Sequence, residues 1–167
     1  MTSSQQAAIT ATVVLIEVAG RLIAVPALDV SAVIELDRIV PTPGAPDHVT
    51  GLAAMRSRAI TVIDVRRAVG IKSAVELDSH SRFPVVEIDG QGYALACDRV
   101  VDIAQPRNAP GPVPPGVGRE WQAIATGCVE MPSAPALLID LEKLVDGASR
   151  SADREEDATA AQSAQLA

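Results

Sequence analysis

The chain has 167 residues, of which 48% are hydrophobic and only 2% aromatic. This length fits one ordinary domain or two joined halves, and it is long enough to bury a real core. Aliphatic side chains must fill that core, and β-branched residues at this density favour β-sheet. The net charge of -7 argues against nucleic acid and anionic lipid as partners, because a negative surface repels phosphate groups.

Short apolar runs separated by turn residues predict about nine β-strands. Residues 1–10 precede them and are expected to be flexible. No Lys or Arg precedes Arg21, which argues against a secretory signal. Charges interrupt every apolar run well before the roughly 20 residues that span a bilayer. We therefore expect an all-β, cytoplasmic protein without membrane insertion, and its predicted strands cover residues 10–18, 21–25, 30–36, 59–65, 83–88, 93–97, 99–104, 124–130 and 136–141.

Two brief helical pieces follow strands at equivalent places, after Asp64 and after Asp140. A carboxylate at the start of a helical turn can accept hydrogen bonds from the free backbone N–H groups of that turn. We therefore interpret both aspartates as caps of the following turn and not as catalytic groups.

The second half contains a Pro- and Gly-rich stretch, residues 106–118, which cannot join a sheet ladder and is predicted to be a connecting loop. Trp121 follows it, and either anchors this loop or marks an exposed contact; anchoring is the favoured interpretation. From 149 to 167 the chain is acidic and Ala-rich without an apolar face, which predicts an unstructured tail, with a short frayed helix as the alternative.

No arrangement of residues predicts catalysis, a metal site or a cofactor site. His48 and His80 lie in polar, turn-rich segments without a second ligand at metal spacing, and are interpreted as loop residues. Cys97 and Cys128 lie in apolar segments, where packing as a reduced thiol is favoured over a disulfide or a reactive site. The glycines lack the spacing of a phosphate-binding loop. We therefore expect a protein that is not an enzyme.

The chain also repeats itself. The segment GRLIAV from Gly20 matches GQGYAL from Gly90, and TGLAAMRSRAITVIDV from Thr50 matches TGCVEMPSAPALLIDL from Thr126. Two similar halves of four or five strands predict a pair of small barrels, because closing each sheet removes its exposed edges.

Arg56 is the clearest difference between the halves, since Pro132 stands at the equivalent position of the second half. An arginine that the turn does not need can serve recognition, because its guanidinium group suits carboxylates and carbonyl oxygens. A solvated arginine at the tip of a hairpin is the equally weighted alternative.

With these segments, together with GRLIAVPALDVSAVIEL and YALACDRVVDIA, the region from about Thr12 to Gly147 resembles the CheW-like domain family. The resemblance implies two intertwined five-stranded SH3-like β-barrels around a shared core, which we place at residues 11–148. It also implies a non-catalytic adaptor that couples chemoreceptors to a CheA-type histidine kinase, and hence recruitment to receptor arrays at the membrane. The expected partners are the regulatory domain of the kinase and the cytoplasmic tip of the receptor.

The resemblance also implies where partners bind. The family motif, an apolar residue followed by Arg-Gly at a turn, falls on Met55, Arg56 and Ser57, with the arginine as the partner contact. Val30 and Gly51 fall on positions that resemble the interaction surface of the family. Ser57 replaces the glycine of the motif and would be strained if the turn needs a positive φ.

The chain departs from the family at two further positions of this surface. Ala54 replaces a polar residue, and Ala32 stands where an acidic residue is common. Two other functions remain open at this point: a CheW-like adaptor of a kinase pathway outside chemotaxis, and a small β-barrel protein that binds a ligand between its barrels.

Overall fold

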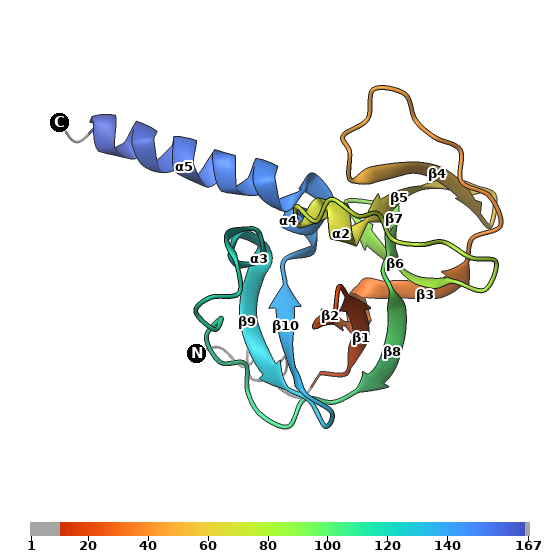
Figure 1. The fold of residues 1–167 in the computed structure, drawn as a ribbon, viewed down its shortest axis with the longest axis horizontal. Helices are drawn as coiled ribbons and strands as arrows, with labels where there is room; N and C mark the ends of the chain where they lie inside the picture. Colours follow the sequence, from red (N-terminus) through yellow and green to blue (C-terminus); the bar gives the residue numbers. More distant parts are fainter. Residues whose placement is uncertain (1–10, 166–167) are drawn as a thin grey trace.

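The computed structural model describes residues 11–165 and shows two β-sheets, four short helical segments and one long terminal helix (Figure 1). The N-terminal segment 1–10 lies outside the described residues. The strands are β1 (Val13–Val18), β2 (Arg21–Pro26), β3 (Val30–Glu35), β4 (Val49–Met55), β5 (Arg58–Asp64), β6 (Arg82–Ile88), β7 (Gln91–Ala96), β8 (Arg99–Ala104), β9 (Ala125–Glu130) and β10 (Pro135–Ile139). The helices are η1 (Ala27–Asp29), α2 (Val65–Ala68), α3 (Arg119–Ile124), α4 (Leu141–Asp146) and α5 (Ala148–Gln165).

Each sheet contains strands from both halves of the chain. The first sheet has the order β8-β1-β2-β10-β9, and the second has the order β3-β6-β7-β5-β4. The two orders become identical when each strand is replaced by its equivalent in the other half. The equivalent strands are β1 and β6, β2 and β7, β3 and β8, β4 and β9, and β5 and β10. The predicted duplication and the predicted intertwining are therefore both confirmed.

Two ladders in each sheet join the halves, and one of the two is parallel. Strand β2 pairs with β10, with Ile23 opposite Leu137, and β5 pairs with β7, with Val62 opposite Ala94. The other ladders are antiparallel. The sheets are SH3-like, but within residues 11–165 no ladder joins β8 to β9 or β3 to β4, so neither sheet closes fully into a barrel.

Aliphatic side chains from both sheets form the main core, as the low aromatic content predicted. Ile16 and Ile23 of the first sheet and Val62, Val85 and Leu95 of the second belong to one buried cluster with at most 1% exposure. Because this cluster spans both sheets, the two halves share it, and burial of its apolar surface holds the sheets together. A smaller buried cluster, which includes Leu15 and Val129, packs on the first sheet.

The loops that precede β4 and β9, one outermost strand of each sheet, cover the free edges of these two strands. Val40 exchanges two backbone hydrogen bonds of 2.8 Å with Leu52 of β4. In the second half, Gly111 of the Pro-rich loop does the same with Cys128 of β9, at 2.8 and 3.0 Å. Covering the edge occupies backbone groups that would otherwise be open to another strand.

Trp121 anchors the Pro-rich loop, as predicted. Its ring is buried beside Gly118, and the guanidinium group of Arg21 stacks 5.3 Å from the ring centroid. Arg21 also donates a hydrogen bond of 3.4 Å to the carbonyl oxygen of Val117. The end of the loop is thereby held against β2, and the indole serves packing and not an exposed contact.

Three features differ from the sequence predictions. Strand β4 is a tenth strand, which the interrupting Gly51 concealed. His48 is not a plain loop residue: its ring is buried, and Nε2 donates a 2.7 Å hydrogen bond to the carbonyl oxygen of Val145 at the end of α4. Where the sequence predicted an unstructured tail from residue 149, the structure has helix α5.

Helix α5 begins after Gly147 and contacts α3 and α4. It then projects from the sheets, and its residues 157–165 are all exposed (Figure 1). Its Ala, Glu, Gln and Arg content explains a helix that has no apolar face, because these residues have high helix propensity. Among the described residues, no helix is both long and apolar enough to cross a membrane.

Candidate functional site

The β4–β5 hairpin presents Arg56 at its tip. A two-residue turn connects the strands, and both of its residues have left-handed backbone angles, with φ of 47° at Arg56 and 67° at Ser57. Turns with two such residues match the right-handed twist of a β-hairpin, and they usually contain Asn or Gly. Ser57 therefore occupies the positive-φ position that the sequence identified as strained.

The outer face of the same hairpin is apolar and exposed. Val40 and Leu52 form a directly opposed pair at the sheet edge, with 52% and 41% exposure. Ala54 and Ala59 continue this face toward the tip and are also exposed. Within residues 11–165, no side chain pairs with the Arg56 guanidinium group. The hairpin thus combines an apolar face with an unpaired cation, a composition typical of protein-binding surfaces.

The other predicted site residues have different surroundings. Met55 ends β4 and is half-buried against the main core. Val30 begins β3, at the opposite edge of the sheet from β4, and also packs on the core. Gly51 is buried in β4 with a φ of 155°, and a Cβ there would overlap the Val40 carbonyl oxygen. The structure therefore gathers Met55, Arg56 and Ser57 at one tip, whereas it gives Gly51 a packing role.

Asp64 and Asp140 cap helices, as predicted. Asp64 accepts a 3.1 Å hydrogen bond from the Arg67 amide, and Asp140 accepts a 3.2 Å hydrogen bond from the Lys143 amide. Asp64 is more deeply buried and also accepts a 3.0 Å hydrogen bond from the Val75 amide. One carboxylate thus starts α2 and holds the following loop in place.

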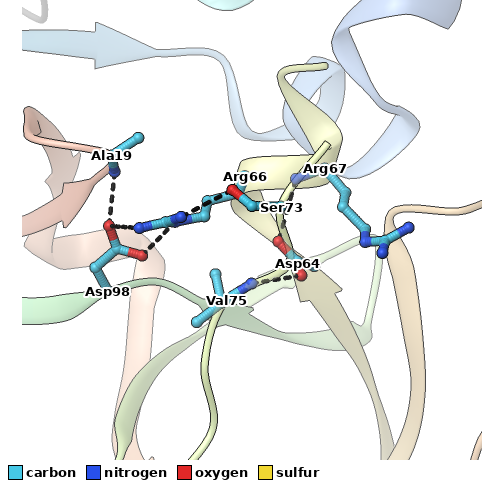
Figure 2. Close-up of polar contacts among 7 residues, drawn as sticks. All are labelled: Ala19, Asp64, Arg66, Arg67, Ser73, Val75 and Asp98. Atoms are coloured by element: carbon cyan, nitrogen blue, oxygen red, sulfur yellow. Dashed lines mark hydrogen bonds and ion pairs between the residues drawn. The ribbon is translucent and has the colours of Figure 1, made fainter. Parts of the chain in front are cut away.

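An ion pair that sequence reasoning missed joins three turns (Figure 2). Arg66 donates two hydrogen bonds to Asp98, at 2.7 and 2.8 Å, and a third of 3.0 Å to Ser73. Asp98 also accepts a 2.7 Å hydrogen bond from the Ala19 amide in the β1–β2 turn. Both charged side chains are mostly buried, which makes this pair less exposed to solvent screening than the others.

The Asp98 carboxylate makes the fold sensitive to acid. Hydrogen bonds from Arg66 are the main reason that its pKa is lowered from the ordinary 3.8. Its stabilising contribution is therefore complete above pH 3.8 and is lost as the pH falls through the lower pKa of the folded state. Asp98→Asn should lower the free energy of unfolding at pH 7 by about 1–3 kcal/mol.

Urea titrations of the parent and of Asp98→Asn from pH 7 downward test this prediction. The difference in free energy of unfolding between the two proteins should become smaller in acid, because the Asp98 carboxylate of the parent is then protonated and also uncharged. Glu35→Gln is the control, since the Arg82–Glu35 pair has 69% and 45% of its side chains exposed and should contribute at most about 1 kcal/mol. If the destabilisation caused by Asp98→Asn did not change with pH, the stabilising role of the charged Asp98 carboxylate would be contradicted.

A groove of about 510 Å³ lies between the two sheets. Its lining is mainly acidic, with Ile88 from β6, Ile139 from β10 and Leu141 from α4 as the apolar members among the carboxylates of Asp29, Glu87, Asp89, Asp140 and Glu142. Among the described residues, no three His, Cys, Asp or Glu side chains could together hold a metal ion. Burial raises the pKa of the Cys97 thiol to about 12, so this thiol is not a nucleophile at neutral pH.

A family model described as the CheW-like domain matches residues 12–149. The chain belongs to the CheW-like domain family. The solved structure of the scaffolding protein TtCheW from Thermoanaerobacter tengcongensis is similar to it, with a TM-score of 0.69 and 26% sequence identity. That similarity covers 81% of this chain and 87% of the other. No curated protein matches the chain in sequence.

Membership in the CheW-like family explains the absence of a catalytic centre among residues 11–165. The family comprises non-catalytic scaffolds and adaptors of chemotaxis signalling, so the predictions of the fold, of an adaptor and of a protein that is not an enzyme are confirmed at this level. The individual contact residues remain predictions.

Proposed function

We propose that this CheW-like chain couples chemoreceptors to a CheA-type histidine kinase. The observation that carries the proposal is the β4–β5 hairpin, with its exposed apolar face and its unpaired Arg56. In this role the chain is a cytoplasmic protein that is recruited to receptor arrays by its partners.

The kinase contact is assigned to the hairpin tip, with Met55, Arg56 and Ser57 at its centre. Gly51 supports the hairpin by packing against Val40, and Val30, at the opposite edge of the same sheet, is proposed as a separate partner contact. Apolar area at Leu52 and Val40 contributes part of the burial that a stable complex needs, typically about 800 Å² on each partner. Arg56 supplies directed hydrogen bonds to carboxylate or carbonyl groups of the regulatory domain of the kinase.

The receptor contact is assigned to the groove between the sheets. Its three apolar side chains lie among carboxylates, a lining that fits a helix with apolar and basic side chains on one face, and the cytoplasmic tip of a chemoreceptor is the proposed occupant. The groove and the hairpin tip consist of different residues, although Glu87 of the groove also pairs with Arg58 of the hairpin, and we propose that both partners bind the chain at the same time. Simultaneous binding is what an adaptor requires.

Arg56→Glu tests the kinase contact. We expect it to weaken binding of the kinase regulatory domain at least tenfold, because the substitution removes the donor groups and places a negative charge in the interface. Isothermal titration calorimetry of the purified chain with that domain measures the loss.

Arg107→Glu is the matched control for Arg56→Glu. Arg107 is also exposed, it lies on the Pro-rich loop of the second half, and its substitution changes the net charge by the same amount. It should bind the kinase domain like the parent. Equal affinity of Arg56→Glu and the parent would rule out the proposed contact.

A further inference from the structure

The β4–β5 hairpin extends beyond the backbone ladder of its neighbour in the sheet. Strand β5 pairs with β7 only from Thr61, opposite Tyr93, to Asp64, opposite Ala96. The residues nearer the tip, from Arg58 to Ile60, pair with β4 alone. The tip therefore depends on side-chain contacts for its position relative to the rest of the sheet.

The turn itself is poorly suited to hold one conformation. Arg56 and Ser57 both have positive φ, and neither is glycine or asparagine, the residues that adopt this geometry most readily. The backbone of the turn is thus strained locally, and strained turns persist where surrounding contacts fix them.

Arg58 makes the contacts that fix this turn. Its Nη1 lies 3.1 Å from Oε1 of Glu87, and its Nη2 donates a 2.9 Å hydrogen bond to the carbonyl oxygen of Gly90. Gly90 lies in the β6–β7 turn, where Asp89 and Gly90 also have positive φ, of 51° and 79°. The Arg58 guanidinium group therefore connects the tip of the β4–β5 hairpin to the β6–β7 turn.

The second half of the chain has neither arginine. Pro132 stands where the first half has Arg56, and Ala134 stands where it has Arg58. Because the fold is duplicated, the fold alone does not require either side chain. If Arg56 serves recognition and Arg58 positions it, both arginines are expected in the same half of the chain.

We infer that Arg58 is a positioning residue that holds Arg56 in the geometry that the kinase recognises. This inference rests on the proposed function of the hairpin. The pair with Glu87 is exposed, with 57% of the Arg58 side chain and 46% of the Glu87 side chain accessible, so its effect on global stability is small. Its effect is to reduce the number of conformations of the tip before binding.

A double-mutant cycle separates positioning from direct contact. The parent, Arg56→Ala, Arg58→Ala and the double variant are titrated with the kinase regulatory domain. We expect Arg58→Ala to weaken binding about threefold to tenfold and to cause no further loss when Arg56 is already alanine. Glu87→Ala should give a smaller loss of the same kind, because the contact with Gly90 remains. Losses that simply multiply in the double variant, or parent affinity for Arg58→Ala, overturn the inference.

Amide hydrogen exchange of the free chain is the second measurement, and it does not depend on the kinase. In Arg58→Ala the amides of Met55 and of residue 58, which face each other across the turn, should exchange at least about threefold faster relative to their intrinsic rates, whereas the urea midpoint should stay unchanged. If Arg56→Ala binds the kinase like the parent, the proposed contact fails. The exchange rates still decide whether Arg58 holds the turn, and unchanged rates reject that.

Discussion

Replacement of Gly51 by alanine is expected to lower the free energy of unfolding by about 2–5 kcal/mol. Two costs combine at this position. The backbone has a φ of 155°, which side chains rarely adopt, and a Cβ would overlap the Val40 carbonyl oxygen and lie 2.8 Å from its carbonyl carbon. Val40 covers the edge of β4 through its backbone pair with Leu52. The Val40 backbone must move away to make room for the new Cβ, and this movement breaks the pair with Leu52.

Alanine substitutions at three other glycines separate the cost of the backbone angle from the cost of the steric overlap. Chemical denaturation measures the free energy of unfolding of each variant. Gly127 is the equivalent position of the second half; a Cβ there would lie 3.0 Å from the Gly111 carbonyl oxygen without a strained φ, so Gly127→Ala should cost less. Gly44 has a φ of 77° and open space, so Gly44→Ala should show the backbone cost alone, about 1 kcal/mol. Gly111→Ala should be nearly neutral. Parent-like stability of Gly51→Ala would mean that Val40 does not pair with β4.

Asp64→Ala should destabilise the fold by about 2–4 kcal/mol, and Asp140→Ala by only about 1 kcal/mol. Both substitutions remove a helix cap. Asp64→Ala also removes the acceptor for the Val75 amide, which lies in a buried position, and an unpaired buried N–H group is costly. The duplicated fold thus provides its own comparison, since the two aspartates occupy equivalent places.

Thermal and urea unfolding of the two variants measure this difference. Asp64→Asn is a useful third variant, because its side-chain oxygen can still accept one of the two hydrogen bonds and should restore part of the loss. Equal destabilisation by Asp64→Ala and Asp140→Ala would show that the bond to Val75 contributes nothing, and would leave Asp64 as an ordinary cap.

The sequence repeat predicted which strands are equivalent but not which strands pair. The matches that begin at Gly20 and Gly90, and at Thr50 and Thr126, identify β2 with β7 and β4–β5 with β9–β10. A repeated pattern is satisfied whether each strand pairs within its own half or with the other half. The exchange of strands between the halves was predicted from the family resemblance. The repeat alone could not predict it, because packing of the shared core in the folded chain determines which strands pair.

Local patterns also limited what could be predicted about the site. Arg56 was identified because the two halves differ there, and Ser57 because it replaces the glycine of the family motif. Asp98 gave no such signal, since its partner Arg66 is 32 residues away and only the folded chain brings them together. His48 lies in a polar segment, and its burial depends on contact with Val145, far along the sequence.

The exchange of strands has a consequence for synthesis of the chain on the ribosome. Strands β1 and β2 emerge first, yet their sheet also needs β8, β9 and β10, which end at Ile139. Long loops must close before these contacts form, and such topologies fold slowly. The aliphatic residues of β1 and β2 therefore stay without their native cover until most of the chain has been translated, and during that interval they are targets for chaperones.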